Sequence, residues 1–347
     1  MFGNIKRVLV SVLIGGLLLS LCACKEDTDI QSETEQKIKI GMCFDTFVIE
    51  RWERDRDVFV STANELGATV DVQNPNGSVE EQIKQLEYFI EQQVDVIVVV
   101  PIKSDSLTDV IHKAKSKNIK VIAYDRLIKN ADIDLYISFD NYMVGSCMAE
   151  VLASKLTPGD KVIMLCGPQT DENVALVKEG FKHTIENAGI EIADEVFLDE
   201  WKSELAYEYI DNNIDEIRDN IKGIMCGNDN LASQAIFALS ENRLAGDILV
   251  TGQDADLDAC QRIVEGTQTM TVYKHVNLLA DQAARSAVDL AEGREIVYDD
   301  TIDNGKGEIP YIKLQPETVT ADNMDEIIIE PGFHSSAEVY INSGKKN

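Results

Sequence analysis

Residues 94–124, VDVIVVVPIKSDSLTDVIHKAKSKNIKVIAY, decide the fold class of this chain. Residues 94–100 are a largely apolar run of the kind that fills a parallel strand buried on both faces. Residues 106–117 are typical of a helix, and residues 119–124 form a second strand run. A strand, a helix and a strand in this order predict a βαβ unit, the building block of a parallel sheet.

The same alternation extends in both directions along the chain. Ser78 and Glu81 form a capping-box pattern that predicts the start of another helix. Further strands and helices are expected at 38–44, 51–66, 69–72, 136–139, 161–166, 191–197, 223–226, 248–252, 269–273 and 276–292. We therefore expect an α/β fold of two doubly wound parallel-sheet lobes joined by a hinge, an architecture suited to closing on a ligand. Periodicity does not tell how often the chain crosses between the lobes.

The N-terminus has the features of a processing signal. Lys6 and Arg7 precede an apolar run at 8–21 that is short for a bilayer span. Cys24 follows the small residue Ala23, as in a lipobox, so we expect residues 1–23 to be removed and Cys24 to be lipidated. The alternative is an ordinary secretory peptide with a chance cysteine. Residues 24–36 are polar and predict a flexible tether.

The composition excludes several classes of protein. A net charge of −29 repels nucleic acid, although the same acidity also serves simply to keep an exported protein soluble. The cysteines of the folded part are expected to be buried free thiols rather than a disulfide framework, and they are Cys43, Cys147, Cys166, Cys226 and Cys260. The four histidines lack metal-ligand spacing, and nucleophile and phosphate-binding motifs are missing from the sequence of the folded part. We expect no catalysis, no cofactor and no metal.

Polar side chains follow several of the predicted strands directly. Asp125 and Arg126 come after the strand that ends at Tyr124, and Asn228 and Asp254 follow two later strands. The carboxyl ends of the strands line the ligand crevice of an open α/β sheet. Planar donors and acceptors gathered with indole rings suit a neutral polyhydroxylated ligand. A sugar-binding protein is therefore the leading interpretation.

Four long segments carry a specific resemblance. They are GMCFDTFVIERWERDRDVF at 41–59, VIAYDRLI at 121–128, DIDLYISFDN at 132–141 and GTQTMTVYK at 266–274. The chain resembles the D-xylose-binding proteins of bacterial ABC transporters with few gaps over residues 38–333. The resemblance implies a type I periplasmic-binding-protein fold with three crossovers between the lobes and one monosaccharide held inside.

The resemblance also implies the residues that bind the sugar. In it, aspartates accept hydrogen bonds from hydroxyl groups, arginines donate to sugar oxygens, and two indole rings sandwich the ring. The matching positions are Arg51, Trp52, Asp125, Arg126, Asp171, Asn173, Trp201, Asn228, Asp254 and Lys274. The sequence departs from the family around Asp171 and Asn173, where the added carboxylate of Glu172 could alter the preference at one hydroxyl. Trp201 is matched only by its place in the strand order.

Most of these residues also have an ordinary structural interpretation. Asn and Asp favour turns in any protein. Asp125 and Arg126 could form a surface ion pair, Lys274 could be a solvated surface lysine, and both tryptophans could be core residues.

The resemblance predicts an extracytoplasmic monomer, anchored to the cell membrane through Cys24, that delivers D-xylose to an ABC permease. Too little room for an exocyclic hydroxymethyl group would exclude hexoses. The N-terminal lobe is expected at 37–139 and 275–308, and the C-terminal lobe at 140–274 and 309–335. The alternative is a sugar sensor of the same fold that signals to a membrane histidine kinase or chemoreceptor. A sugar-responsive repressor is excluded, because an export signal stands where its DNA-binding helices would lie.

Overall fold

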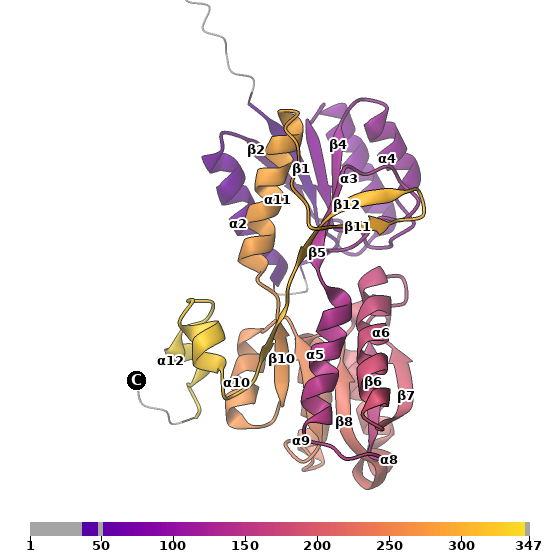
Figure 1. Ribbon diagram of the computed structural model, residues 1–347, viewed down its shortest axis with the longest axis vertical. Coiled ribbons are helices and arrows are strands. Elements are labelled where there is room, and N and C mark those ends of the chain that lie inside the picture. Colours follow the sequence, from indigo (N-terminus) through magenta and orange to yellow (C-terminus); the bar gives the residue numbers. More distant parts are fainter. Residues whose placement is uncertain (1–36, 48–50, 344–347) are drawn as a thin grey trace, which may run out of the picture. The chain divides into compact units, whose positions relative to one another are not determined.

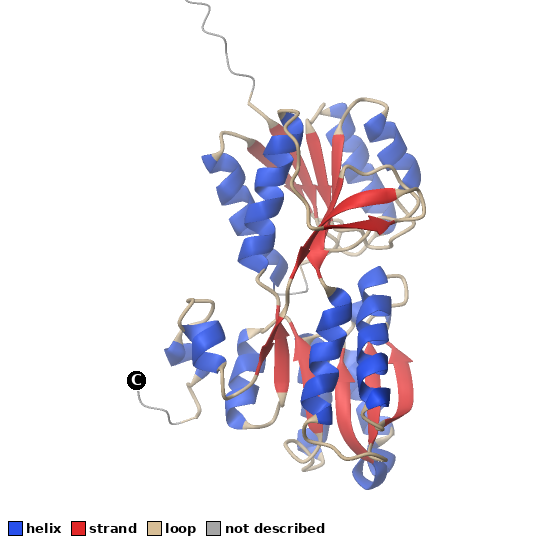
Figure 2. Cartoon of the chain, viewed as in Figure 1, coloured by secondary structure: helices blue, strands red, loops and turns tan. Residues whose placement is uncertain are grey.

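The computed structural model describes residues 37–47 and 51–343. These residues form two α/β lobes, each built around its own sheet, which we call the N-lobe and the C-lobe (Figures 1 and 2). The expected signal segment, the tether and Cys24 lie outside the described residues. Among the helices that are described, none combines the length and apolarity needed to cross a bilayer.

The N-lobe contains a seven-stranded sheet in the order β11-β12-β5-β4-β3-β1-β2. Its strands are β1 (Lys39–Cys43), β2 (Thr69–Gln73), β3 (Val96–Val99), β4 (Lys120–Tyr124), β5 (Leu135–Phe139), β11 (Asp300–Asp303) and β12 (Glu308–Leu314). All neighbours pair in parallel except β11, which is antiparallel to β12 at the edge. The helices are α2 (Arg51–Glu65), α3 (Val79–Glu91), α4 (Thr108–Lys115) and α11 (Val276–Ala291).

The C-lobe contains a six-stranded sheet in the order β13-β10-β9-β8-β6-β7. Its strands are β6 (Lys161–Cys166), β7 (Glu191–Phe197), β8 (Ile221–Cys226), β9 (Leu249–Gln253), β10 (Met270–Tyr273) and β13 (Glu317–Val319). Only β13 pairs antiparallel. The helices are α5 (Asn141–Ala153), α6 (Glu172–Asn187), α7 (Glu204–Asn212), α8 (Ile214–Asn220), α9 (Asp229–Glu241), α10 (Leu257–Glu265), α12 (Ser336–Val339) and the short η1 (Asp199–Trp201) and η2 (Asp325–Ile329).

The two sheets repeat one winding. The order β2-β1-β3-β4-β5 in the N-lobe corresponds to β7-β6-β8-β9-β10 in the C-lobe, each with an antiparallel strand added near one edge. The predicted α/β class with two doubly wound lobes is therefore confirmed. In such sheets the ligand crevice lies at the carboxyl ends of the strands, where the winding reverses direction.

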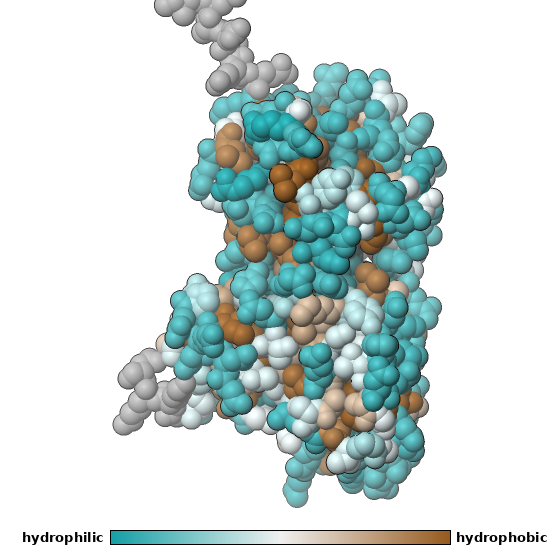
Figure 3. Space-filling view, in the orientation of Figure 1, coloured by the Kyte–Doolittle hydropathy of each residue, from teal (hydrophilic) through white to brown (hydrophobic). Residues whose placement is uncertain are grey.

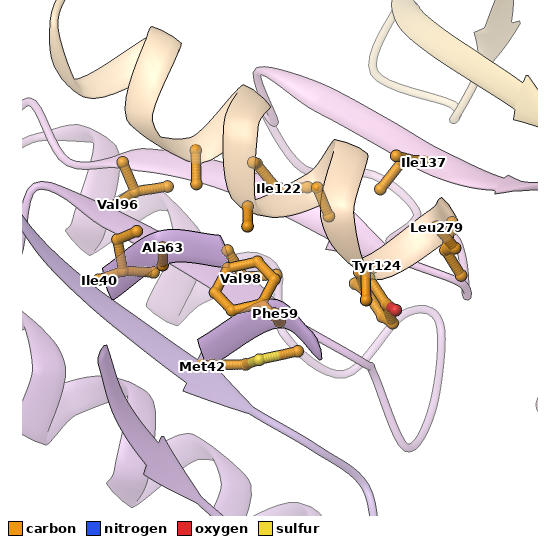
Figure 4. Close-up of a cluster of buried hydrophobic side chains, with 14 of the residues drawn as sticks. Ile40, Met42, Phe59, Ala63, Val96, Val98, Ile122, Tyr124, Ile137 and Leu279 are labelled. Carbon is orange, nitrogen blue, oxygen red and sulfur yellow. The ribbon is translucent and has the colours of Figure 1, made fainter. Parts of the chain in front are cut away.

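The core explains why residues 94–100 read as a strand buried on both faces. Val96 and Val98 pack into a cluster that includes α2 and α11 residues, whereas Ile97 and Val99 pack into a second cluster with α3 and α4. Figure 4 shows the first cluster, in which Leu279 of α11 and Phe59 of α2 lie against the sheet. Because successive side chains point to opposite faces of a strand, each face of the sheet supplies one core.

The chain passes between the lobes three times, after β5, after β10 and after β12 (Figure 1). The third crossing differs from the expected boundary at 308/309. Residues 309–314 pair with β5 of the N-lobe, so the chain crosses only between Leu314 and Glu317. Pro310 lies within this strand, opposite Thr301 of the antiparallel edge strand, and a proline in the run weakened the strand signal. The C-lobe also extends past the expected end at 335, since Val339 and Tyr340 pack with Cys260.

The structure confirms two local predictions, the helix cap at Ser78 and the free cysteines. Ser78 is the N-cap of α3 and accepts a hydrogen bond from the backbone N–H of Glu81, as the capping pattern predicted. The five cysteines within the described ranges are buried and unpaired, which confirms the free-thiol prediction.

On the face shown in Figure 3, hydrophilic residues predominate and apolar residues form small separate patches.

Candidate functional site

All ten residues that the sequence singled out line one pocket. The space between the lining atoms is about 520 Å³ when the part open to solvent is included. The remaining lining residues are Asn141, Cys166, Gly167, Val174, Val177, Met225, Gly227 and Gln253. The lining therefore combines residues of both lobes.

Strand ends position most of these side chains. In the N-lobe, Arg51 and Trp52 open α2 after β1, and Asp125 and Arg126 follow β4. In the C-lobe the residues lie after four neighbouring strands: Asp171 and Asn173 after β6, Asn228 after β8, Asp254 after β9 and Lys274 after β10. The pocket thus lies where the carboxyl ends of the strands of both sheets meet, as the doubly wound topology predicts.

Arg51 contacts carboxylates of both lobes. Its Nη2 lies 3.2 Å from Asp55 Oδ1 and 3.0 Å from Asp125 Oδ2, and its Nη1 lies 3.7 Å from Asp254 Oδ1. Burial disfavours the charged guanidinium, but Asp125, Asp55 and Asp254 outweigh it and raise the pKa of Arg51 well above its usual value. Asp55 in turn accepts a hydrogen bond from the Tyr124 hydroxyl. A fully ionised, fixed arginine therefore stands at the junction of the lobes.

Asp125 is held in an uncommon backbone conformation. Its φ of 61° lies in the left-handed region, which side chains other than glycine rarely adopt. Its backbone N–H donates to Ile137 O at 2.8 Å, and Asn173 Nδ2 donates to its Oδ1 at 3.3 Å. Burial raises the pKa of the Asp125 carboxyl, but Arg51, Lys274 and Arg126 outweigh it and hold the pKa below its usual value. The residue is therefore an ionised acceptor in the pocket wall.

Arg126 bridges a carboxylate of each lobe. Its Nη1 lies 2.6 Å from Asp45 Oδ2 and its Nε lies 2.8 Å from Asp171 Oδ2. Burial raises the pKa of Asp171, and the charge of Arg126 acts against that rise. Asp171 is also the N-cap of α6, where its Oδ1 accepts from the backbone N–H of Asn173 at 3.0 Å. Arg126 is buried, so the interpretation as a surface ion pair is wrong.

Asp254 and Lys274 form the corresponding wall of the C-lobe. Lys274 Nζ lies 3.0 Å from Asp254 Oδ1, and Lys274 is only 4% exposed, which rules out a solvated surface lysine. Asp254 has a φ of 100°, and its backbone N–H donates to Val272 O at 2.8 Å. This geometry repeats that of Asp125. In each lobe, one strand is followed by an aspartate whose backbone has a positive φ.

The two indole rings combine core packing with the pocket lining. Trp52 is buried beside Phe44 and Tyr124, and the Arg51 guanidinium lies 4.4 Å from its ring centroid. Trp201 is half-buried and ends the short helix η1. A methyl group at Gly167 would overlap the Trp201 ring, so a glycine there permits the ring to approach the strand end. The core interpretation is thus true of Trp52 without removing it from the pocket wall.

Five polar atoms of the lining residues lack a hydrogen-bond partner within the described part of the chain. They are Trp52 Nε1, Trp201 Nε1, Asp125 Oδ2, Gln253 Oε1 and Asp254 Oδ1. Both carboxylate oxygens lie at ion-pair distance from a cation, yet neither accepts a hydrogen bond of acceptable geometry. Buried polar atoms of this kind are rare in native proteins, and a bound ligand or solvent molecule is one explanation for them. Two donors and three acceptors of the lining residues therefore make no hydrogen bond within the protein.

Known proteins share this arrangement of lobes. The sequence model of the periplasmic binding protein domain matches residues 40–295. This chain belongs to that family. A D-xylose-binding periplasmic protein of Escherichia coli (strain K12) is 39% identical over 330 residues, 94% of this chain and 99% of that protein. One of Haemophilus influenzae is 38% identical, covering 89% of this chain and 94% of that protein.

A solved structure agrees with the fold. An ABC transporter solute-binding protein of Clostridium phytofermentans with bound β-D-glucose superimposes with a TM-score of 0.80 at 27% identity, covering 87% of this chain and 99% of that one. The resemblance to D-xylose-binding proteins and the type I fold are therefore confirmed. The family consists of solute-binding proteins rather than enzymes. No set of side chains suited to a metal ion occurs within residues 37–47 and 51–343.

Several residues of this periplasmic binding protein's site escaped the sequence reasoning. Asn141 lines the pocket at the start of α5, and its place directly after β5 was the available signal. Gln253, which the sequence marks together with Asp254 at the end of an apolar run, also lines the pocket and donates through Nε2 to Gly227 O. Asp45 and Asp55 support the two arginines from outside the pocket, which no local pattern announces.

Glu172 does not act as the sequence departure suggested. Its Oε2 lies 3.1 Å from Lys129 Nζ at the partly exposed edge of the lobe contact. It is not among the residues that line the pocket, so the expectation of an added carboxylate at the ligand is wrong. Asp171 and Asn228 fulfil both interpretations, because each caps a helix through its side chain and lines the pocket.

Proposed function

We propose that this protein is a solute-binding receptor that captures one monosaccharide between its two lobes, and that the sugar is D-xylose. The ten residues that line the pocket from both lobes would hold it. The single observation that carries the proposal is the set of five lining atoms that make no hydrogen bond, on Trp52, Trp201, Asp125, Gln253 and Asp254. Their two donors and three acceptors match a ligand whose hydroxyl groups both donate and accept.

The wall chemistry supports a sugar over a charged solute. Among the residues that line the pocket, the carboxylates of Asp125, Asp254 and Asp171 equal in number the cations of Arg51, Arg126 and Lys274, and each of the six takes part in an ion pair. A charged ligand would leave one of these buried groups without its counter-ion, which is strongly unfavourable. A neutral polyol instead accepts from the cations and donates to the carboxylates, while its C–H faces pack on the indole rings.

The choice of D-xylose rests on two observations. Two relatives that align over 89% or more of the chain are D-xylose-binding proteins by name. Val174, Val177 and Met225, which belong to one apolar cluster, also line the pocket, and their side chains offer no hydrogen-bond partner to an extra hydroxymethyl group. A buried hydroxyl without a partner costs about 1–3 kcal/mol, so a hexose would bind more weakly.

We further propose that the receptor acts as a monomer outside the cytoplasm, held at the membrane by a lipid on Cys24, and that it delivers the sugar to an ABC permease. The relatives that are periplasmic by name and the transporter protein of similar structure support this assignment. Mass spectrometry of the protein purified from its membrane fraction tests the anchor. A diacylglyceryl-modified Cys24 at the N-terminus is expected, and an unmodified N-terminus would contradict it.

The ligand assignment is tested by calorimetric titration with D-xylose, D-ribose, L-arabinose, D-glucose and D-galactose. One-to-one binding that is tightest for D-xylose is expected. Tighter binding of another aldose would refute the assignment of D-xylose as the ligand, but it would leave the proposed sugar-receptor function intact. Absence of binding by all five would refute the receptor itself.

A further inference from the structure

Asp229 is a fully buried carboxylate that adjoins the pocket residue Asn228 but does not line the pocket. Its Oδ1 accepts from Gln268 Nε2 at 2.8 Å, and its Oδ2 accepts from Thr271 Oγ1 at 2.8 Å and from the backbone N–H of Asp256 at 3.1 Å. An ionised carboxylate can only accept, and here both of its oxygens do. The residue is therefore fully engaged behind the pocket wall.

The partners of Asp229 are themselves fixed in orientation. Arg262 Nε donates to Gln268 Oε1 at 3.0 Å, so the amide nitrogen of Gln268 must face Asp229. Arg262 is held by Asp258, whose Oδ2 lies 2.5 Å from Nη1. Gly252 of β9 lies against the carboxylate, because a methyl group there would overlap Asp229 Oδ1. The network therefore links α9, α10, β9 and β10.

The same network holds the loop that carries Asp254. Asp254 and Ala255 have φ values of 100° and 55°, conformations that side chains rarely adopt and that persist only where the surroundings impose them. Thr271 Oγ1 accepts from the backbone N–H of Ala255 at 3.2 Å, while Asp229 accepts from that of Asp256. On the other side of the loop, His334 Nε2 lies 2.8 Å from Ala255 O.

We infer that Asp229 and Thr271 are positioning residues that hold the Asp254 carboxylate in its binding orientation from behind the pocket. Thr271 is the link, since its hydroxyl donates to Asp229 and accepts from Ala255 at the same time. The consequence for affinity rests on the proposed sugar binding, whereas the contacts that fix the loop are present without reference to a ligand.

The electrostatic setting agrees with such a role. Arg262 and Asp254 are the charged groups that face Asp229, and the thiols of Cys226 and Cys260 lie on the elements packed against it. Burial raises the pKa of Asp229 to about 7, against the opposing effects of Arg262 and Thr271. A carboxylate with a raised pKa directly behind a pocket wall is a candidate for a functional role.

The neighbouring strand provides a matched control. Thr271→Val removes the linking hydroxyl and keeps the shape of the side chain. Thr251→Val makes the same change at a fully buried threonine of β9 whose hydroxyl has no hydrogen-bond partner in the described residues. Thr271→Ser retains the hydroxyl and should restore the wild-type behaviour. All three variants are made in the whole protein.

The first measurement is hydrogen–deuterium exchange of the peptide that contains the Ala255 and Asp256 amides. Exchange in Thr271→Val should be faster by roughly tenfold than in the wild type, with Thr251→Val and Thr271→Ser unchanged. Equal exchange in the two valine variants would overturn the inference. Thermal unfolding identifies any variant that is globally destabilised, and Asp229→Asn then provides a second perturbation of the same loop.

The second measurement is D-xylose affinity in the same variants. A loss of roughly tenfold in Thr271→Val, with less than twofold change in the controls, supports the inference. If exchange changes as expected but the wild type binds no sugar, the positioning of the loop stands and the proposed function fails. If sugar binds and both valine variants bind alike, the positioning role is overturned and the proposed function stands.

Discussion

Arg126 Nε lies 2.8 Å from Asp171 Oδ2, and this buried ion pair joins the end of β4 in the N-lobe to the N-cap of α6 in the C-lobe. The same guanidinium contacts Asp45 of its own lobe at 2.6 Å. Arginine presents its donors in a planar fork, so one side chain can serve two carboxylates in different directions. The pair therefore lies in the pocket lining and across the contact between the lobes, so under the proposed function it would link ligand binding to that contact.

Arg126→Lys tests this link, because lysine keeps the charge but cannot reproduce the fork. Truncating one partner of a buried charged pair costs about 2–5 kcal/mol, or roughly 30- to 4,000-fold, and acts on the off-rate. Because lysine keeps the charge, we expect a smaller loss of sugar affinity, roughly 10- to 100-fold, mostly as faster dissociation. Stopped-flow tryptophan fluorescence measures both rates.

Lys129→Gln is the matched control for that variant. Its ion pair with Glu172 also joins the lobes, at 3.1 Å, but the two side chains are 38% and 32% exposed. Such surface pairs contribute little, about 0–1 kcal/mol. We expect less than a fivefold change. A larger effect of Lys129→Gln than of Arg126→Lys would contradict the role of the buried pair.

Trp201→Ala should weaken sugar binding by roughly 30-fold, because a buried aromatic anchor contributes about 2 kcal/mol or more. Trp201→Phe should lie between this variant and the wild type, since a smaller ring retains part of the stacking face. Titration followed by the fluorescence of the remaining Trp52 measures both. Full affinity in Trp201→Ala would show that this ring does not contact the ligand.

Gly167→Ala tests the same ring without altering it. The added methyl group would overlap the indole of Trp201 and displace it. We expect an affinity loss in the range of the Trp201→Phe variant, with the two changes non-additive when combined because they act on one contact. Simple additivity would indicate separate effects.

Asp229 predicts a specific pH dependence of stability. Its folded pKa, raised by burial to about 7, exceeds that of an unfolded aspartate, so the folded state binds the extra proton. This group therefore favours the folded state at low pH and loses that contribution as pH rises from about 4 to about 7. As pH rises over that window, the free energy of unfolding of the wild type should fall relative to that of Asp229→Asn. Above the window, the difference between the two proteins should stay constant.

Urea unfolding at several pH values measures that difference. The comparison removes the contributions of the other acidic groups, which are common to both proteins. A difference that is independent of pH between 4 and 8 would contradict a raised pKa at Asp229.

The cysteines should be unreactive in the native protein. Burial raises the pKa of Cys43 and Cys166 to about 12, and it also raises the pKa of Cys147, Cys226 and Cys260, so at pH 8 the thiolate is scarce and inaccessible. A thiol reagent should label none of these five before denaturant is added. Rapid labelling of any of them under native conditions would be inconsistent with the packing.

The residues that line the pocket could be anticipated from the sequence, because the family resemblance named ten of them and most follow strand ends. Asn228 and Asp254 come directly after buried runs, and the topology then brings these ends to one pocket. The supporting residues could not be found this way. Asp45 reaches Arg126 across 81 positions of sequence, a separation that only the folded chain makes short. Gly167 matters because of the Trp201 ring, and no glycine pattern announces that contact.

The parallel strands at the centre of each sheet were predicted well from the sequence, whereas the strands at the sheet edges were predicted less well. Buried parallel strands such as β3 are continuous apolar runs, but β12 is interrupted by Pro310 and begins with Glu308. Its membership of the N-lobe depends on pairing with β5, far away in sequence. The third crossing was accordingly misplaced.

The most direct test of the central claim is a crystal structure of the protein grown with D-xylose. It should show one pentose ring between Trp52 and Trp201, with hydroxyl groups within hydrogen-bond distance of Asp125 Oδ2 and Asp254 Oδ1. A ring bound elsewhere, or a pocket in which those two oxygens take no part in holding the sugar, would contradict it.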